Sequence, residues 1–528
     1  MKHLLFLIFA VQACLPGFAA CDGRVRIVPR PAEVEELPGS FRLTPRTPVV
    51  ITDEQLRTPA EIFARAVGKL TGTEPAVTAA PEKHAVTLQL QPGYEAEEYH
   101  LAVGRQRITV TASTPQAVLH GLRSLQQLVA GGEIPACVVR DKPTVAYRGA
   151  MRDVCRHFFP VEDVKTYIDI LSLHKINKFH WHLTDDQGWR IEIKKFPLLT
   201  QIGSRRAETL VGRYDKNKEG VYDGNPYGEF YTQEEIREIV SYAAERHIEV
   251  IPEIEMPGHG LAALTAYPWL GCTGGPYAVW THWGISDDVY CAGKETTFEF
   301  IEKVLTEVLA LFPSKLIHIG GDECPKGRWK ACPLCQQRIR EEGLKDEYQL
   351  QSYFIHRIER WMHTHGREII GWDEILQGGI SKTANIMSWN GSDPGIKAAQ
   401  RGNPVIMTPK WYCYFDYSQT SDPERYEPLG NTRYVSVRQA YRLDPCDRLT
   451  LPDQKRIRGV QCNLWTEYIA DIRHAQHMVL PRMAALAETG WANDRKDYND
   501  FVRRIPALVA VYKAEGYNYA PYLFEGIE

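Results

Sequence analysis

The segment Leu316-Ile-His-Ile-Gly-Gly-Asp-Glu323 joins a short apolar run to two glycines and two adjacent carboxylates. The apolar run predicts a buried strand over Leu316–Asp322. Polar groups that directly follow a buried strand are typical of parallel β/α proteins, whose sites lie at the carboxyl ends of the strands. Other short apolar runs after Tyr147 also end in polar or aromatic residues, so we interpret this segment as one unit of a series.

The series contains eight candidate strands separated by helical stretches. The predicted strands are Tyr147–Arg156, Lys178–Asp185, Glu249–Glu255, Leu316–Asp322, Glu368–Asp373, Asn385–Trp389, Pro404–Tyr414 and Gly459–Glu467. Predicted helices between them include Pro160–Leu173, Gln233–Glu245, Thr297–Leu311 and Gln349–Thr364. Eight such units predict an α/β fold, a (β/α)8 barrel over residues 146–510, with enlarged loops at 203–231 and 267–296.

Residues 22–143 are predicted to form a separate small α/β domain. Its predicted strands are Val49–Thr52, Ala85–Leu90, Tyr99–Val103 and Ile108–Ala112, and its predicted helices are Thr58–Thr71 and Thr114–Leu128. Few candidate catalytic groups lie here, so we expect a scaffold. Residues 511–528 are expected to form a C-terminal tail packed on the barrel.

The first 20 residues have the pattern of a signal peptide. Lys2 and His3 precede a short apolar run, and small residues lead to Ala19 and Ala20. We therefore expect export to the periplasm, the cell surface or the medium, with Cys21 or Cys14 as a candidate lipid-modified residue. The net charge of −4 and the lack of a basic stripe argue against nucleic acid as a partner. A membrane is expected as a partner only through a lipid anchor.

The adjacent carboxylates Asp322 and Glu323 suggest acid catalysis. Two neighbouring carboxylates repel each other's charge, so one pKa rises and that group can act as a general acid. A solvated acidic loop is the simpler alternative. A retaining glycosidase usually places its two carboxyl groups about 5 Å apart on opposite sides of the bond, which adjacent residues cannot easily do. Their adjacency therefore favours a substrate-assisted reaction, in which a 2-acetamido oxygen of the sugar is the nucleophile.

Seven motifs at successive predicted strand ends make the chain resemble the β-N-acetylhexosaminidases of glycoside hydrolase family 20. They are Asp153-Val-Cys-Arg-His-Phe158, His180-Trp-His-Leu-Thr-Asp-Asp186, Pro257-Gly-His259, Gly320-Gly-Asp-Glu323, Gly371-Trp-Asp-Glu374, Tyr414-Phe-Asp416 and Trp465-Thr-Glu467. The resemblance covers residues 147–500, and the preceding domain is similar to the small domain of that family. It implies hydrolysis of terminal β-linked GlcNAc or GalNAc by an exo-acting, retaining enzyme.

The resemblance also implies a role for each site residue. Glu323 would be the general acid and base, Asp322 would orient the acetamido group, and Tyr414 would bind the acetamido oxygen. The implied substrate-binding residues are Arg156, Asp185, His259, Trp372, Trp389, Asp416, Trp465 and Glu467. Among them, Arg156, Asp416 and Glu467 would bind sugar hydroxyls, the tryptophans would form the pocket, and Asp185 and His259 would orient the acid. Thr466 stands where glycine is frequent in the family.

Three alternatives remain open from the sequence. His180 and His182 on one strand could bind metal in an amidohydrolase-type barrel. A glycan-binding protein without activity would keep the aromatic pocket but would not need Glu323, Asp322 and Tyr414 together. A disaccharide-releasing enzyme of the lacto-N-biosidase type would need a wider pocket. We expect no metal and no cofactor, and the sequence leaves the oligomeric state and the choice between GlcNAc and GalNAc open.

The cysteines predict cross-links outside the catalytic motifs. Cys272 and Cys291 bracket a loop rich in glycine, proline and aromatic residues, and we predict a disulfide between them. Cys332 and Cys335 form a Cys-x-x-Cys pair that could bind metal or form a tight disulfide. Because no second pair has zinc-finger spacing, we favour a structural role for this pair.

Overall fold

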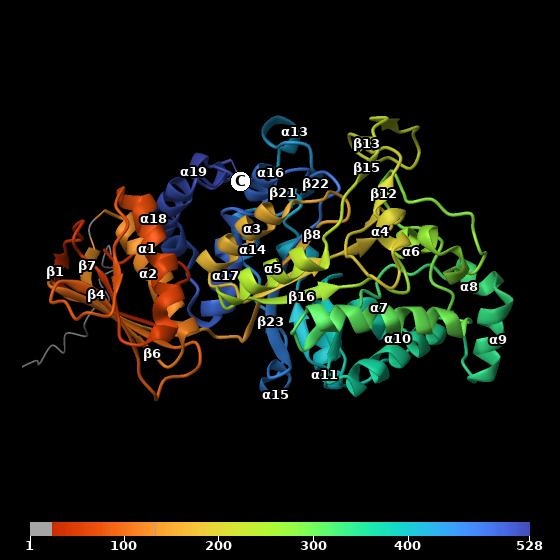
Figure 1. Cartoon of the computed structure of the whole chain (residues 1–528), viewed down its shortest axis with the longest axis horizontal. Helices are drawn as coiled ribbons and strands as arrows, with labels where there is room; N and C mark the ends of the chain where they lie inside the picture. Colours follow the sequence, from red (N-terminus) through yellow and green to blue (C-terminus); the bar gives the residue numbers. More distant parts are fainter. Residues whose placement is uncertain (1–23, 133, 528) are drawn as a thin grey trace, which may run out of the picture.

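The structure, a computed structural model, describes residues 24–132 and 134–527. A small domain lies at one end of the molecule and a barrel forms the rest (Figure 1). The predicted signal peptide, with Cys14 and Cys21, lies outside the described residues. Within the described part of the chain, no helix is both long enough and apolar enough to cross a membrane.

The barrel is closed by eight parallel strands, which confirms the predicted fold class. Its strands are β8 (Tyr147–Asp153), β9 (Lys178–His182), β16 (Glu249–Glu253), β17 (Leu316–His318), β18 (Glu368–Trp372), β19 (Asn385–Ser388), β20 (Val405–Met407) and β23 (Ile457–Leu464). Each strand pairs with the next in this order, and β23 pairs with β8 to close the ring. Side chains such as Ile251, Ile370 and Met387 fill the interior, so the barrel is a packed core rather than a channel.

Several strands end earlier than the sequence predicts. The strand predicted over Pro404–Tyr414 ends at Met407, and a short helix α12 (Lys410–Cys413) precedes Tyr414. Pro409 stands at the start of that helix and has no N–H to donate to a neighbouring strand. The polar residues that we assigned to strand ends therefore lie on the loops just beyond them.

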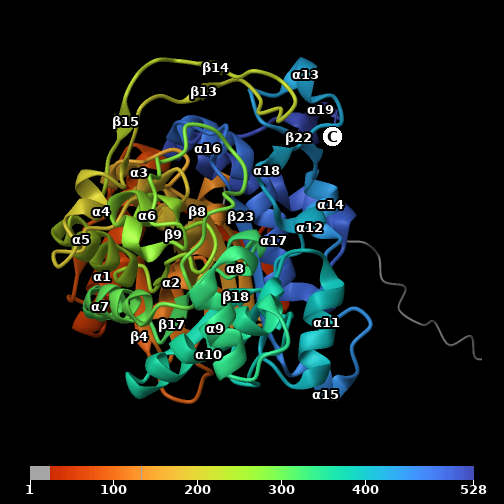
Figure 2. The same cartoon turned by 90° about the vertical axis from the view of Figure 1, so that its right-hand side faces the viewer.

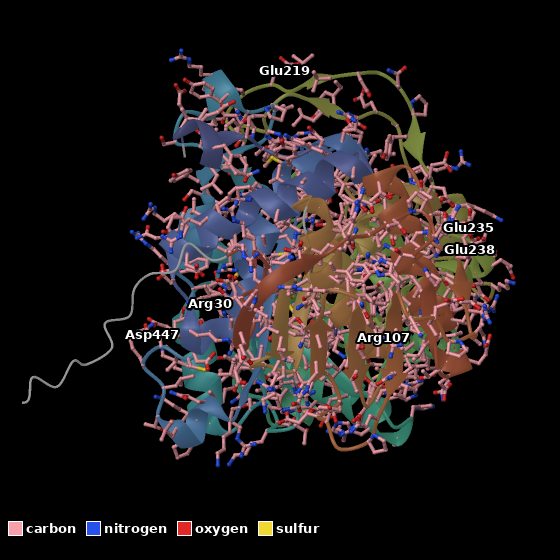
Figure 3. All side chains as sticks on the ribbon, turned by 90° about the vertical axis from the view of Figure 1, so that its left-hand side faces the viewer. Arg30, Arg107, Glu219, Glu235, Glu238 and Asp447 are labelled. Atoms are coloured by element: carbon pink, nitrogen blue, oxygen red, sulfur yellow. The ribbon has the colours of Figure 1, made fainter. Side chains whose placement is uncertain are left out.

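The N-terminal domain is a seven-stranded mixed sheet with two helices on one face. The strands run in the order β1-β7-β5-β6-β4-β2-β3. Their bounds are β1 (Glu33–Phe41), β2 (Val49–Ile51), β3 (Val77–Thr78), β4 (Ala85–Leu90), β5 (Tyr99–Val103), β6 (Arg107–Ala112) and β7 (Ile134–Asp141). Figure 3 views the molecule from this end, with Arg107 of β6 toward the viewer. The sequence missed β1, β3 and β7, and β1 is a largely exposed edge strand without apolar alternation.

Helices join the two domains. Helices α1 (Arg57–Thr71) and α2 (Pro115–Ala130) lie between the sheet and α18 (Tyr498–Glu515) in Figure 1. Trp491, near the end of α17 (Arg482–Ala492), packs into the core of the small domain. The boundary expected at residue 511 falls inside α18, so the tail begins within the last turns of that helix. Beyond it, the backbone N–H of Asn518 donates to Gln476 of α16 (Ile472–Val479) at 2.9 Å, next to the barrel.

The enlarged loop at 203–231 crosses one side of the carboxyl-end face of the barrel. It contains two short ribbons, β12 (Arg205–Arg206) with β15 (Tyr227–Gly228) and β13 (Leu210–Val211) with β14 (Val221–Tyr222). Figure 2 shows β13 and β14 running across the top of the molecule toward α13 (Pro423–Tyr426). Arg213 fastens them there, because its Nη1 lies 2.6 Å from Oε1 of Glu424 and its Nε donates to the Gly430 carbonyl at 2.9 Å.

Candidate active site

Two glycines allow the loop after β17 to place Asp322 and Glu323 over the barrel. Gly320 and Gly321 have φ angles of 66° and 93°, which only glycine adopts easily. A Cβ on Gly320 would lie 1.7 Å from Oε2 of Glu255. Glu323 itself has a φ of 41°, so the loop is held in an unusual conformation at the residue expected to act as acid.

His259 connects the two carboxylates to a second acidic pair. Its Nδ1 lies 3.2 Å from both Asp185 Oδ1 and Asp186 Oδ2. Its Nε2 lies 3.5 Å from Oε2 of Glu323 and 3.8 Å from Oδ2 of Asp322. Burial opposes a charge on His259, but Asp185 and its neighbours raise the pKa of His259 well above its usual value. The surrounding carboxylates therefore favour the charged imidazolium form of His259.

Asp322 and Glu323 differ in environment although they are adjacent. The Asp322 side chain is 10% exposed and that of Glu323 is 33% exposed, so Glu323 is the one that solvent and substrate reach more easily. Burial raises the pKa of Asp322 to about 7, with His259 opposing the shift and Glu323 adding to it. Burial and the charge of Asp322 likewise raise the pKa of Glu374 to about 8. The site thus gathers more carboxyl groups than can all be ionised cheaply at neutral pH.

Four aromatic rings from consecutive strand ends stand beside these carboxylates. The rings of Trp389 and Tyr414 are stacked with centroids 5.9 Å apart. The ring of Trp465 lies 6.3 Å from that of Tyr414 and 5.9 Å from that of Trp372. Two of these rings are held by carboxylates, since Trp372 Nε1 donates to Glu253 and Trp389 Nε1 donates to Glu374, both at 2.8 Å. The result is an apolar wall with fixed ring orientations, suited to a small apolar group such as a methyl.

Arg156 lies beside the Trp465 ring and is held by polar side chains. Its Nε donates to Gln187 Oε1 at 2.9 Å, and its Nη2 lies 2.9 Å from Oδ2 of Asp185. Its guanidinium carbon lies 4.9 Å from the centre of the Trp465 ring. Burial works against the charge, but Asp185 and Asp153 raise the pKa of Arg156 well above its usual value. A planar, permanently charged donor is therefore fixed at the edge of the pocket.

Glu467 lies near Arg156, and Asp416 lies near Glu467. Burial raises the pKa of Asp416 well above its usual value, and the charge of Glu467 adds to the shift. Partial burial also raises the pKa of Glu467, while Arg156 opposes the shift. Among the described residues, buried Oδ1 of Asp416 has no hydrogen-bond partner. Buried oxygens without donors are costly, so this part of the site suits a ligand that carries hydroxyl groups.

Several residues of the site were missed from the sequence. Glu253 is completely buried, and three histidines surround it: His318 Nδ1 lies 2.8 Å from it, His180 Nε2 lies 3.0 Å from it, and His182 Nδ1 contacts it. The sequence placed Glu253 inside the predicted strand Glu249–Glu255, whereas in the structure it is the last residue of β16. Because this carboxylate engages His180 and His182, the metal-dependent alternative is not needed to explain the two histidines.

Other missed residues hold Arg156 and its loop. Asp153 Oδ2 accepts hydrogen bonds from the backbone N–H and the hydroxyl of Thr466, at 3.1 and 2.9 Å. The Thr466 hydroxyl in turn accepts from the His157 N–H at 3.1 Å. The threonine that departs from the family pattern therefore ties the loop after β23 to the loop after β8. Gln187 directly follows a quoted motif, but nothing in the sequence indicates that it binds Arg156.

Comparisons with known proteins find relatives that match both domains of the chain. The model of the glycosyl hydrolase family 20 catalytic domain matches residues 145–494, and that of domain 2 of the same family matches residues 24–142. A β-hexosaminidase of Porphyromonas gingivalis is 40% identical over 550 aligned positions, which cover 98% of this chain and 68% of the relative. An exo-β-N-acetylglucosaminidase of Vibrio harveyi, solved with N-acetylglucosamine, superposes with a TM-score of 0.83 at 31% identity, covering 94% of this chain and 78% of that one. A β-N-acetylhexosaminidase of Streptomyces coelicolor gives a TM-score of 0.82 at 32% identity, covering 94% and 97%.

Proposed function

Because the chain belongs to glycosyl hydrolase family 20 and is an exo-acting β-hexosaminidase, we propose that Glu323 and Asp322 share one substrate-assisted reaction. The resemblance seen in the sequence is thereby confirmed, and a metal-dependent barrel or an inactive glycan-binding protein is set aside. The observation that supports the proposal most directly is that both carboxylates lie on one loop within 4 Å of His259 Nε2, and that the charge of Asp322 acts on Tyr414 of the aromatic wall.

In the first step, the 2-acetamido oxygen of the substrate attacks the anomeric carbon. Glu323 donates its proton to the glycosidic oxygen, the bond to the leaving sugar breaks, and a cyclic oxazolinium forms. Asp322 accepts a hydrogen bond from the acetamido N–H as positive charge develops there, which stabilises the transition state. In the second step, the Glu323 carboxylate takes a proton from water, the water oxygen attacks the anomeric carbon, and the ring reopens with retained configuration.

Tyr414 and the tryptophans would hold the acetamido group for attack. We assign the Tyr414 hydroxyl as the donor to the acetamido oxygen, and Trp372, Trp389 and Trp465 as the walls around its methyl. Fixing these atoms in a reactive geometry converts the attack into an intramolecular step, which can supply several kcal/mol of the barrier. His259 would connect Asp185 to Glu323 through its two ring nitrogens and so hold the carboxyl group of Glu323 in position.

Arg156, Asp416 and Glu467 would bind the hydroxyl groups of the terminal sugar. Charged donors and acceptors around hydroxyls favour a chain end over an internal residue, because a glycosidic bond there would leave them unpaired. Terminal β-linked GlcNAc is the substrate that the relatives support, and we propose that GalNAc is also accepted. Product analysis on β-GlcNAc, β-GalNAc and lacto-N-biose-capped glycans tests this, since release of a disaccharide would contradict a single-sugar pocket.

The arginine gives a first prediction. Replacing Arg156 by lysine should lower kcat/KM on a β-GlcNAc substrate about 10²-fold, because two charge-assisted hydrogen bonds of about 1.5–3 kcal/mol each cannot both be remade by an ammonium group. Arg237→Lys, on the exposed face of α5 (Gln233–Ala244), is the matched control and should be unchanged. Equal kcat/KM values for the two variants would show that Arg156 does not bind the substrate.

A second prediction concerns the cyclic intermediate. A thiazoline analogue of the oxazolinium should inhibit competitively and bind far more tightly than the GlcNAc product, because it resembles a species close to the transition state. Binding should weaken in Tyr414→Phe, which keeps the ring but removes the hydroxyl donor. Isolation of a covalent glycosyl-enzyme during turnover would instead identify a nucleophile on the protein.

We also propose that the enzyme is exported, to the periplasm, the cell surface or the medium, with Cys21 or Cys14 as the site of any lipid. The apolar run and the small residues after it support this proposal. The mass of the mature N-terminal peptide tests it directly. A protein that keeps Met1 in its native host would contradict export, and a diacylglyceryl mass on a cysteine would distinguish a lipoprotein from a secreted form.

A further inference from the structure

Four cysteine thiols converge at one point outside the catalytic site. The Sγ atoms of Cys272, Cys291, Cys332 and Cys335 all lie within 4.8 Å of one another. The disulfide predicted between Cys272 and Cys291 is wrong, because both cysteines are free. The sequence could not indicate the cluster, since one pair lies on the loop after β16 and the other at the start of helix α9 (Pro333–Glu341).

The distances between the sulfurs fit a metal better than they fit disulfides. Cys291 Sγ lies 3.6 Å from Cys335 Sγ and 3.8 Å from Cys332 Sγ, and Cys272 Sγ lies 3.8 Å from Cys335 Sγ. A disulfide requires about 2.05 Å. Four sulfurs about 2.3 Å from a central zinc ion at tetrahedral angles are about 3.8 Å apart. The three measured distances match that tetrahedron, and all four sulfurs lie within 4.8 Å of one another.

We propose that Cys272, Cys291, Cys332 and Cys335 bind one zinc ion as a structural tetrathiolate site. Four sulfur ligands at tetrahedral spacing suit zinc or iron, and a full set of four protein ligands is typical of a structural zinc site. This proposal departs from the expectation, drawn from the sequence, that the chain holds no metal. The ion would take no part in the glycosidase reaction.

The surroundings of the thiols support a built site. Cys291 and Cys335 are completely buried, Cys332 is 5% exposed, and Cys272 is half-buried. Cys332 caps α9 and Cys335 lies in its first turn, where the helix dipole stabilises negative charge such as a thiolate. The two segments also touch closely, because a Cβ on Gly293 would lie 2.3 Å from the carbonyl carbon of Leu334.

The cysteine cluster joins two segments of the chain, each of which also contacts or contains a catalytic group. Between Cys272 and Cys291, the loop reaches Asp186: the Trp280 N–H donates to its carbonyl and the Ser286 N–H donates to its carboxylate, both at 3.1 Å. Asp186 in turn contacts His259. On the other side, helix α8 (Gly327–Ala331) lies between Glu323 and Cys332, and the two helices stand at the end of the molecule opposite the N-terminal sheet (Figure 1). The metal would therefore brace the loop that supports His259 against the segment that follows the acid.

The purified full-length enzyme provides the direct test. Elemental analysis of protein prepared without added metal should give about one zinc per chain, and alkylation after unfolding without reductant should label all four cysteines. A tetrathiolate site should also bind Co²⁺ in place of zinc with the visible absorption of tetrahedral sulfur coordination. Absence of metal would overturn the proposal, whether the thiols are free or are paired in disulfides such as Cys272–Cys335. Stoichiometric iron would contradict the choice of ion.

Variants locate the ion without relying on activity. Cys272→Ser, which removes the least buried ligand, should lose zinc on dialysis against a chelator under conditions in which the wild-type enzyme keeps it. Cys446→Ser is the matched control, since Cys446 is also a half-buried free cysteine but lies outside the cluster. Equal zinc retention by both variants would show that the metal is bound elsewhere. If Cys272→Ser does not fold, the wild-type metal content and cysteine labelling still decide the proposal.

Discussion

The Glu323→Gln enzyme is expected to lose turnover by about 10²–10⁴-fold on β-GlcNAc disaccharides, the usual contribution of general acid catalysis. Glutamine keeps the shape of the side chain but has no proton to give to the leaving oxygen. Substrates with an activated aryl leaving group need less protonation, so they should lose much less in the first step. Steady-state kinetics on the two substrate classes measure the difference.

Glu238→Gln is the matched control, because Glu238 is an exposed glutamate on α5, remote from the barrel mouth. It should keep wild-type kinetics. Binding of GlcNAc to Glu323→Gln should also stay close to that of the wild type, which separates loss of chemistry from loss of binding. Near-wild-type turnover of Glu323→Gln on a disaccharide would show that another group is the acid.

The Asp322→Asn enzyme is expected to lose about 10²–10³-fold in kcat, the effect typical of removing one preorganised electrostatic partner of a transition state. The acetamido N–H gains positive charge during cyclisation, and an asparagine can orient it but cannot neutralise it. The loss should therefore remain on activated aryl substrates, unlike that of Glu323→Gln. Equal leaving-group dependence in the two variants would contradict separate roles for the two carboxylates.

The same substitution should make the protein more stable at alkaline pH. The folded-state pKa of Asp322 is about 7, above the ordinary value of 3.8, so folding disfavours its ionised form. The loss of folding stability caused by ionised Asp322 is small near pH 4 and grows as the pH rises to 7. Above pH 7 this loss is constant, at about 1.4 kcal/mol for each unit by which the folded pKa exceeds the unfolded pKa. The Tm of Asp322→Asn should therefore exceed that of the wild type at pH 8, and the two should converge near pH 4. A lower Tm at pH 8 would show that ionised Asp322 stabilises the fold.

The barrel could be predicted from the sequence because each buried parallel strand is a short apolar run that ends in polar residues. The lengths of the strands could not be predicted. Residues such as Tyr414 belong to loops whose path is set by packing at the carboxyl end of the barrel. The edge strand β1 was missed because its exposed residues, which begin at Glu33, carry no alternating pattern. Edge strands are defined by a neighbour, here β7, rather than by their own burial.

The groups expected to touch the sugar were identified from their motifs, and the structure brings them together at one end of the barrel. The residues that hold these groups in position were not identified from the sequence. Glu253 is fixed by three histidines from other strands, and Thr466 by Asp153 far away in the chain. The four cysteines are a similar case, because Cys272 and Cys335 meet only after the loops have folded. Contacts between distant segments leave no local pattern in the sequence, so their partners could not be predicted.

The central claim is that the nucleophile is the acetamido oxygen of the substrate. Aryl β-glucosaminides carrying acetyl, fluoroacetyl, difluoroacetyl and trifluoroacetyl groups on nitrogen test it most directly, because each fluorine withdraws electrons from that oxygen. With the leaving group kept the same, kcat/KM should fall at every step of the series. Rates that do not depend on fluorination would contradict the claim, since they would show that the acetamido oxygen does not attack in the rate-limiting step.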